Sequence, residues 1–283
     1  MRSARAVAGA ALAVLACLAA PARAQTGEQP NLIFTISGGI LAGGNLWTLP
    51  RQLVFSDQTG LGDQWDTLEL GRRLHAGFQA TLGATYFWKP HLGLNMEVGF
   101  FGLESESACS PVGAITPTPL NNYQNAQACT SANGMNLPGS ATGFLAGLAY
   151  RVTTRGIQPY VRAGIGPAIL GTSFVETIGQ AVVDSTTRAT VYMLADEHHK
   201  ELTWMASVGA GLMLPLAPGY QVRMEFRDIF IALPRPTGPA TDTAEIAHEG
   251  AYPDPPIGTR LVSVASFTMG LDVVLEKRRG HRY

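Results

Sequence analysis

Charged residues recur at every second position in stretches of this sequence that otherwise have the composition of β-strands. The clearest stretch is YQVRMEFRDIF, residues 220–230, where Arg223, Glu225 and Arg227 alternate with apolar residues. Successive side chains of a strand point to opposite faces, so these three charges share one face. A carboxylate between two guanidinium groups pairs with them wherever water is excluded, because an unpaired buried charge is very costly.

Three further charged residues, Glu97, Arg162 and Asp272, fall on the polar faces of other alternating segments. If all polar faces turn inward, six charges line one lumen: Glu97, Arg162, Arg223, Glu225, Arg227 and Asp272. The favoured interpretation is a structural plug of ion pairs that holds a narrow interior closed. The alternative is a narrow gated pathway, lined by arginines, that prefers anions. The same faces also place His75, Gln79 and Arg151 in the lumen.

Eight segments with period-two alternation can position these residues. They are residues 32–42, 75–88, 92–103, 142–152, 157–170, 201–214, 220–233 and 261–275. Short turns alternate with long polar stretches along the chain. The turns are residues 89–91, 153–156 and 215–219, and the long stretches are residues 43–74, 104–141, 171–200 and 234–260. Within 43–74 and 171–200, the pattern would extend the neighbouring strands into hairpins. The sequence predicts an all-β fold: an eight-stranded antiparallel up-and-down transmembrane β-barrel with three short periplasmic turns and four long extracellular loops.

Lipid is the expected environment of the apolar faces. Each segment matches or exceeds the ~9 to 11 residues that a tilted strand needs to cross a membrane. The opposite faces hold mainly Gly, Ser and Thr with embedded charges, which would make a poor core for a soluble barrel or sandwich. Aromatic residues at the turn-side strand ends are predicted to form an interfacial girdle: Tyr86, Trp88, Tyr150, Tyr160 and Tyr220.

The N-terminus has the pattern of an export signal. Arg2 and Arg5 precede an apolar run over residues 6–20, and Ala22-Arg23-Ala24 fits an A-x-A cleavage site. We therefore expect residues 1–24 to be a signal peptide and residues 25–283 to form the barrel. A second processing route remains open, in which Cys17 is acylated. Loss of three arginines changes the formal net charge from −1 to −4, which argues against nucleic acid as a partner.

Two cysteines, Cys109 and Cys129, lie in one polar stretch of the exported part, and we expect them to form a disulfide. A metal or redox pair is the alternative, but their spacing fits neither C-x-x-C nor a zinc knuckle. No hydrolase, metalloprotease, Walker or Rossmann motif is present, so no enzyme, cofactor or metal is predicted. The acidic and histidine-rich stretches, Asp57 to Asp66 and Asp196 to His199, are interpreted as solvated loops.

The exported part resembles the eight-stranded OmpA-like outer-membrane β-barrel family, in its layout and in strands such as GFQATLGATYFW and YQVRMEFRDIF. The resemblance implies a monomer in outer-membrane lipid, inserted by the barrel-assembly machinery. Two departures are visible. No peptidoglycan-binding domain follows the last strand, and that strand is followed by Glu276-Lys277-Arg278-Arg279 rather than ending on an aromatic residue.

Two functions agree with this sequence. One is a structural or surface-interaction protein whose long loops contact an extracellular ligand. The other is a small passive channel, either ionic or admitting small apolar solutes sideways as in OmpW-like barrels.

Overall fold

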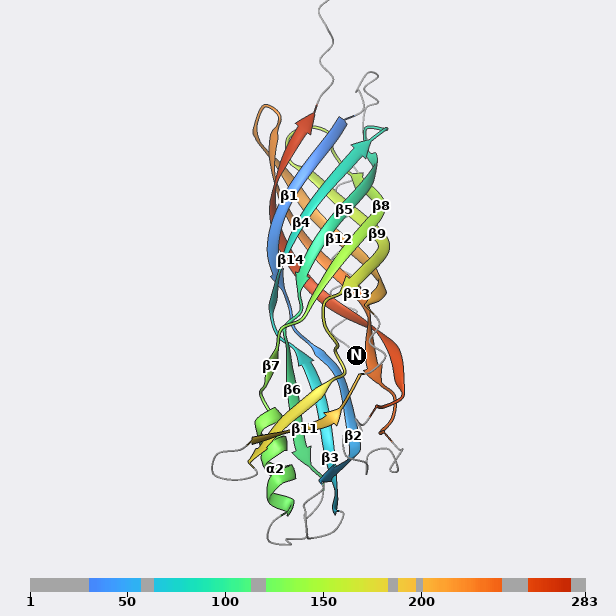
Figure 1. Cartoon of the computed structure of the whole chain (residues 1–283). Coiled ribbons are helices and arrows are strands. Elements are labelled where there is room, and N and C mark those ends of the chain that lie inside the picture. Colours follow the sequence, from blue (N-terminus) through green and yellow to red (C-terminus); the bar gives the residue numbers. More distant parts are fainter. Residues whose placement is uncertain are drawn as a thin grey trace, which may run out of the picture.

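Eight antiparallel strands close into a barrel (Figure 1) in this computed structural model, which describes residues 31–56, 64–112, 121–182, 188–196, 201–240 and 254–275. The barrel strands are β1 (Asn31–Leu41), β4 (Gly77–Phe87), β5 (Leu92–Gly102), β8 (Ser140–Arg151), β9 (Gln158–Leu170), β12 (Leu202–Ala217), β13 (Tyr220–Pro236) and β14 (Ile257–Leu275). Each pairs with its neighbours along the chain, and β1 closes the barrel by pairing with both β4 and β14. The predicted fold class and all eight predicted strands are confirmed. The predicted signal peptide lies outside the described residues and stays a prediction.

The hairpin of β13 and β14 is longer than predicted. Its pairing runs without a break from Tyr220↔Val273 to Pro236↔Ile257. In contrast, β1 pairs with β14 only as far as Leu41↔Ser266. The last hairpin therefore projects beyond the rim of the barrel.

The other long connections carry secondary structure of their own, which we call the extension (lower part of Figure 1). It consists of a four-stranded sheet, a two-stranded sheet and one helix: β2 (Asn45–Ser56), β3 (Gln64–Leu74), β6 (Ser105–Pro111), β7 (Asn136–Leu137), β10 (Thr177–Val182), β11 (Arg188–Leu194) and α2 (Asn121–Ala132). Paired strands do lie within 43–74 and 171–200, but β2–β3 and β10–β11 belong to sheets separate from the barrel rather than extending its strands. The 104–141 stretch, predicted as a long loop, contains β6, α2 and β7. No helix among the described residues is long and apolar enough to cross a membrane.

The outer face of the barrel is apolar, as the alternation predicts. Ile36, Leu82 and Phe226 are 65%, 60% and 71% exposed. Such a belt suits lipid rather than water. Four of the five predicted girdle residues are exposed at the turn end: Tyr86, Trp88, Tyr150 and Tyr220. The girdle prediction is wrong for Tyr160, which is only 3% exposed and points into the lumen. Its position on β9 gives it the same parity as the inward-facing Arg162.

The interior of the barrel is packed in layers. At the turn end, a small apolar cluster is buried: Ile33, Phe87, Ala149, Tyr160 and Met213. Toward the extension, a larger apolar cluster includes lumen residues such as Phe101, Leu145, Met205, Ile229 and Ile231, and it continues into the core of the extension. The charged residues of the lumen lie between these two clusters.

Candidate functional site

Four of the predicted lumen charges form one ion-pair network. Arg162 bonds two carboxylates, with its Nη1 2.6 Å from Glu97 Oε2 and its Nε 2.7 Å from Glu225 Oε1. Arg227 bonds the same two carboxylates, with its Nε 3.2 Å from Glu225 Oε1 and its Nη1 2.5 Å from Glu97 Oε1. These side chains are buried, so each charge relies on its partners rather than on water.

The network crosses the full width of the lumen. Glu97 lies on β5 and Arg227 on β13, and three strands separate β5 from β13 in either direction around the barrel. An eight-stranded barrel is only wide enough for its own side chains to fill it. The Arg227–Glu97 pair therefore joins opposite walls, and Arg162 on β9 and Glu225 on β13 complete the layer.

Strand β12 makes room for this layer with a glycine between two methionines. Gly209 is in register with Arg162 on one side and with Arg227 on the other. A Cβ at position 209 would lie 2.4 Å from Glu225 Oε1, so a side chain there would displace the carboxylate. Met205 and Met213, four residues before and after Gly209, belong to the two apolar clusters.

A second ion pair lies nearer the turn end. Arg223 Nη2 is 3.0 Å from Asp272 Oδ2, and Thr35 donates a hydrogen bond of 2.7 Å to Asp272 Oδ1. This pair joins β13 to β14, and Thr35 ties it to β1, the first strand. All six predicted charges are thus paired, and the three guanidinium groups balance the three carboxylates.

The sequence reasoning missed the part played by Tyr160. Its hydroxyl donates a 2.6 Å hydrogen bond to Glu225 Oε2, and its ring lies 5.0 Å from the Arg223 guanidinium. Tyr160 therefore connects the two sets of ion pairs. Tyr160 lies two residues before Arg162 on the same strand, so both side chains face the lumen. That spacing could have identified Tyr160 as a lumen residue.

Replacing Tyr160 with Phe should remove one donor from a buried carboxylate while keeping the ring. We expect the free energy of unfolding to fall by about 1.5–3 kcal/mol, the usual worth of a hydrogen bond to a charged group. Urea unfolding of the lipid-reconstituted protein measures it. Tyr86→Phe, on the exposed outer face, is the matched control, and an equal loss in both variants would contradict the assigned role.

The remaining predicted lumen residues have mixed outcomes. Gln79 is buried inside the barrel. Arg151 is buried at the turn end, where its Nε donates a 2.6 Å hydrogen bond to Pro90 O and its guanidinium covers the Phe87 ring. The prediction that His75 lies in the lumen is wrong. His75 is exposed at the base of the extension, and its Nε2 is 2.9 Å from Glu106 Oε2.

The disulfide joins Cys109 on β6 to Cys129 on α2, with 5.3 Å between their Cα atoms. It fixes the helix to the four-stranded sheet of the extension.

The segment of residues 173–176 is clamped in the extension by two side chains. Trp47 Nε1 donates a 2.8 Å hydrogen bond to Phe174 O, and Arg72 donates to the carbonyls of Ser173 and Glu176. Burial lowers the pKa of Arg72 to about 10, and the carboxylate of Glu176 opposes this shift. These contacts make the extension a packed unit rather than a set of separate loops.

No group of three or more metal-ligating side chains gathers among the described residues. Asp57, Asp63 and residues 197–199 lie outside the described part of the chain, and so does the side chain of Asp66. The loop prediction is wrong for residues 64–66, which belong to β3, where Asp66 is in register with Val54. For residues 57–63 and 197–199 it stays a prediction.

A closed eight-stranded barrel with an apolar outer belt and a polar, charged interior defines the class of outer-membrane β-barrels. The family described as "Outer membrane protein beta-barrel domain" matches residues 10–245. The chain belongs to this family and is located in the bacterial outer membrane, so the extension lies on the extracellular side. No curated protein matches the sequence.

Several solved structures are similar to this chain at low sequence identity. The outer membrane protein OprG from Pseudomonas aeruginosa has 11% identity and a TM-score of 0.45, over 88% of this chain and 98% of that one. Neisserial surface protein A has 9% identity and a TM-score of 0.40, over 87% and 99%. The outer membrane enzyme PagL has 12% identity and a TM-score of 0.33, over 84% and 98%.

Proposed function

We propose that this protein is a non-conducting outer-membrane barrel that acts through its extracellular extension, as a structural or surface-interaction protein. The observation that carries the proposal is the ion-pair layer formed by Glu97, Arg162, Glu225 and Arg227 across the lumen. An ion entering from either end would meet charges that are already neutralised by one another.

The apolar clusters on both sides of this layer support the same proposal. Phe101, Leu145 and Met205 are at most 4% exposed on the extension side, and Ile33 and Phe87 are at most 2% exposed on the turn side. Removal of one ion pair would therefore leave two apolar layers across the path of an ion.

The extension supplies the surface that would contact the surroundings. Its sheet, its helix and the disulfide between them form a unit with its own buried core, including Trp47, Leu70 and Phe174. A preformed surface loses little conformational freedom on binding, which favours recognition of an extracellular ligand. The proposal includes a monomer held in outer-membrane lipid after insertion by the barrel-assembly machinery, with no catalytic step and no nucleic acid partner.

Conductance across a planar bilayer tests the closed lumen. We expect purified, refolded protein to give no discrete current steps, after heat-modifiable gel migration has confirmed that the barrel is formed. Discrete anion-favouring steps that change in Arg162→Ala would contradict the proposal and support the alternative of a small ion channel.

A further inference from the structure

A cavity of about 360 Å³ lies in the wall of the molecule, where the barrel joins the extension. Its lining comes from the ends of β9, β12, β13 and β14 and from two connecting segments. Seven of the eleven lining residues are apolar, Leu170, Leu202, Ala232, Pro234, Pro255, Pro256 and Ile257, and four are polar, Asp196, Thr203, Asp254 and Thr259. The volume falls within the range of about 300–1,000 Å³ that is typical of small-molecule sites.

The cavity exists because β12 and β13 no longer pair at this level of the wall. The last pair of their ladder is Met205↔Ile231, whereas β13 continues to Pro236 with β14 as its partner. Pro234 has no N–H to offer to a neighbouring strand. At Ala232 the carbonyl oxygen accepts a hydrogen bond from the Thr203 hydroxyl rather than from a backbone N–H of β12. From there toward Pro236, β12 and β13 form no ladder, and the wall remains open.

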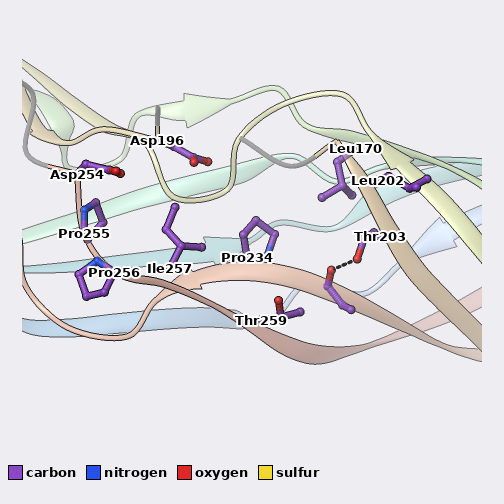
Figure 2. Close-up of a pocket in the computed structure, with 11 residues that line it drawn as sticks. Leu170, Asp196, Leu202, Thr203, Pro234, Asp254, Pro255, Pro256, Ile257 and Thr259 are labelled. Atoms are coloured by element: carbon purple, nitrogen blue, oxygen red, sulfur yellow. Dashed lines mark hydrogen bonds between the residues drawn. The ribbon is translucent and has the colours of Figure 1, made fainter. Parts of the chain in front are cut away.

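The two ends of the cavity differ in chemistry (Figure 2). Asp196 and Asp254 lie at one end, Leu170 and Leu202 lie at the other, and Pro234 and Ile257 lie between them. Asp196 also accepts a hydrogen bond from the Ser173 hydroxyl. A ligand that fills the cavity would therefore meet carboxylates at one end, and mainly apolar side chains with Thr203 and Thr259 along the rest of its length.

The walls are held in place without a ligand. Thr237 donates two hydrogen bonds to Pro256 O, from its backbone N at 2.8 Å and from its hydroxyl at 2.9 Å. These bonds fix the segment of residues 254–256 against the end of β13, and the prolines limit its backbone further. A preformed cavity spares the ligand the cost of ordering its walls.

Several lining residues are exposed, and Leu202 is one of them. It lines the cavity and is 69% exposed, and Trp204 on the same face of β12 is 66% exposed. The mouth thus lies beside the apolar outer face of the barrel, where amphiphiles gather in the outer leaflet.

We propose that this cavity binds a small amphiphilic amine, with its protonated head at Asp196 and Asp254 and its apolar body against Leu202 and Ile257. Carboxylates favour a protonated amine over a hydroxyl, because the ammonium group adds the attraction between opposite charges to the hydrogen bond. The site is separate from the ion-pair layer of the lumen, so its ligand needs no passage through the barrel.

Methyl NMR of the refolded full chain in lipid nanodiscs tests the proposal. The probes are cyclohexylmethylamine, cyclohexylmethanol and cyclohexanecarboxylate, which share an apolar body and differ in the head. We expect saturable shifts at the Ile257 and Leu202 methyl groups with the amine, binding about tenfold or more weaker with the alcohol, and none with the carboxylate.

Two variants assign the binding to the cavity. Asp196→Asn with Asp254→Asn should weaken amine binding to the level of the alcohol, whereas Glu69→Gln, an exposed acid of the extension, should leave it unchanged. Ala232→Phe should fill the cavity and abolish the shifts with every probe. Equal binding of amine and alcohol, no saturable shift in the wild type, or amine binding that survives Ala232→Phe would each overturn the proposal.

Discussion

Replacing Arg162 with Met should lower the free energy of unfolding by about 3–5 kcal/mol, the usual cost of removing one partner from a buried ion pair. Arg162 bonds both Glu97 and Glu225, and its side chain is only 7% exposed. Met keeps much of the volume but leaves two carboxylates to share Arg227. Urea unfolding from lipid vesicles, followed by tryptophan fluorescence, measures the loss.

A double variant separates lost charge from lost packing. Glu97→Gln combined with Arg162→Met restores the balance of charges in the network, so it should recover a clear part of the stability. Arg235→Met, an exposed arginine on β13 beyond the barrel, should change little. A double variant as unstable as Arg162→Met alone would contradict the electrostatic explanation.

The second large effect is expected from removing the disulfide. Replacing Cys109 and Cys129 with Ser opens a loop closed over a sequence separation of 20 residues, which should destabilise the attachment of α2 by about 3 kcal/mol. Hydrogen exchange of the α2 amides should then accelerate by about a hundredfold. Among its described residues, α2 is also held by the buried Ala128 and Ala132 and by a hydrogen bond that Gln180 N on β10 donates to the Ser131 hydroxyl.

The barrel itself should not respond to this change. Heat-modifiable migration of the double Ser variant should match that of the wild type, because no barrel strand takes part in the disulfide. Ser110→Ala, next to Cys109 on the same strand and exposed, is the matched control. Unchanged exchange in α2 would mean that packing against β10, rather than the disulfide, holds the helix.

The barrel was predictable from sequence because lipid imposes one rule on every strand. Residues such as Ile36 and Phe226 must face lipid, their neighbours must face the lumen, and the alternation records this at each position. The structure of the extension was not predictable in the same way. Among the side chains that the structure describes, helix α2 buries only the small residues Ala128, Cys129 and Ala132 and is otherwise mostly polar, so its apolar face gives a weak periodic signal. The pairing of β2 with β3 is interrupted between Leu49 and Gln52.

The sequence predicted which charged residues line the lumen, but not which of them form ion pairs with one another. Parity along each strand placed the six charges in the lumen. Depth from the turns predicted one group of Glu97, Arg162, Arg223 and Glu225, but Arg223 pairs with Asp272 nearer the turn end. Which guanidinium bonds which carboxylate depends on the register between strands and on the space left at Gly209, and a single strand does not encode either. Tyr160 was misplaced because its location near a turn was given more weight than its parity.

The order in which the strands arrive determines when the lumen becomes dry. Glu97 and Arg227 are 130 positions apart in the chain, and Thr35 and Asp272 are 237 apart. Contacts of such long range form late in folding. Until β13 joins the growing sheet, Glu97 has only Arg162 as a partner, and until β14 joins, Arg223 has no Asp272. A barrel that lacks β13 and β14 must therefore keep water around these charges, and the arrival of that hairpin expels it.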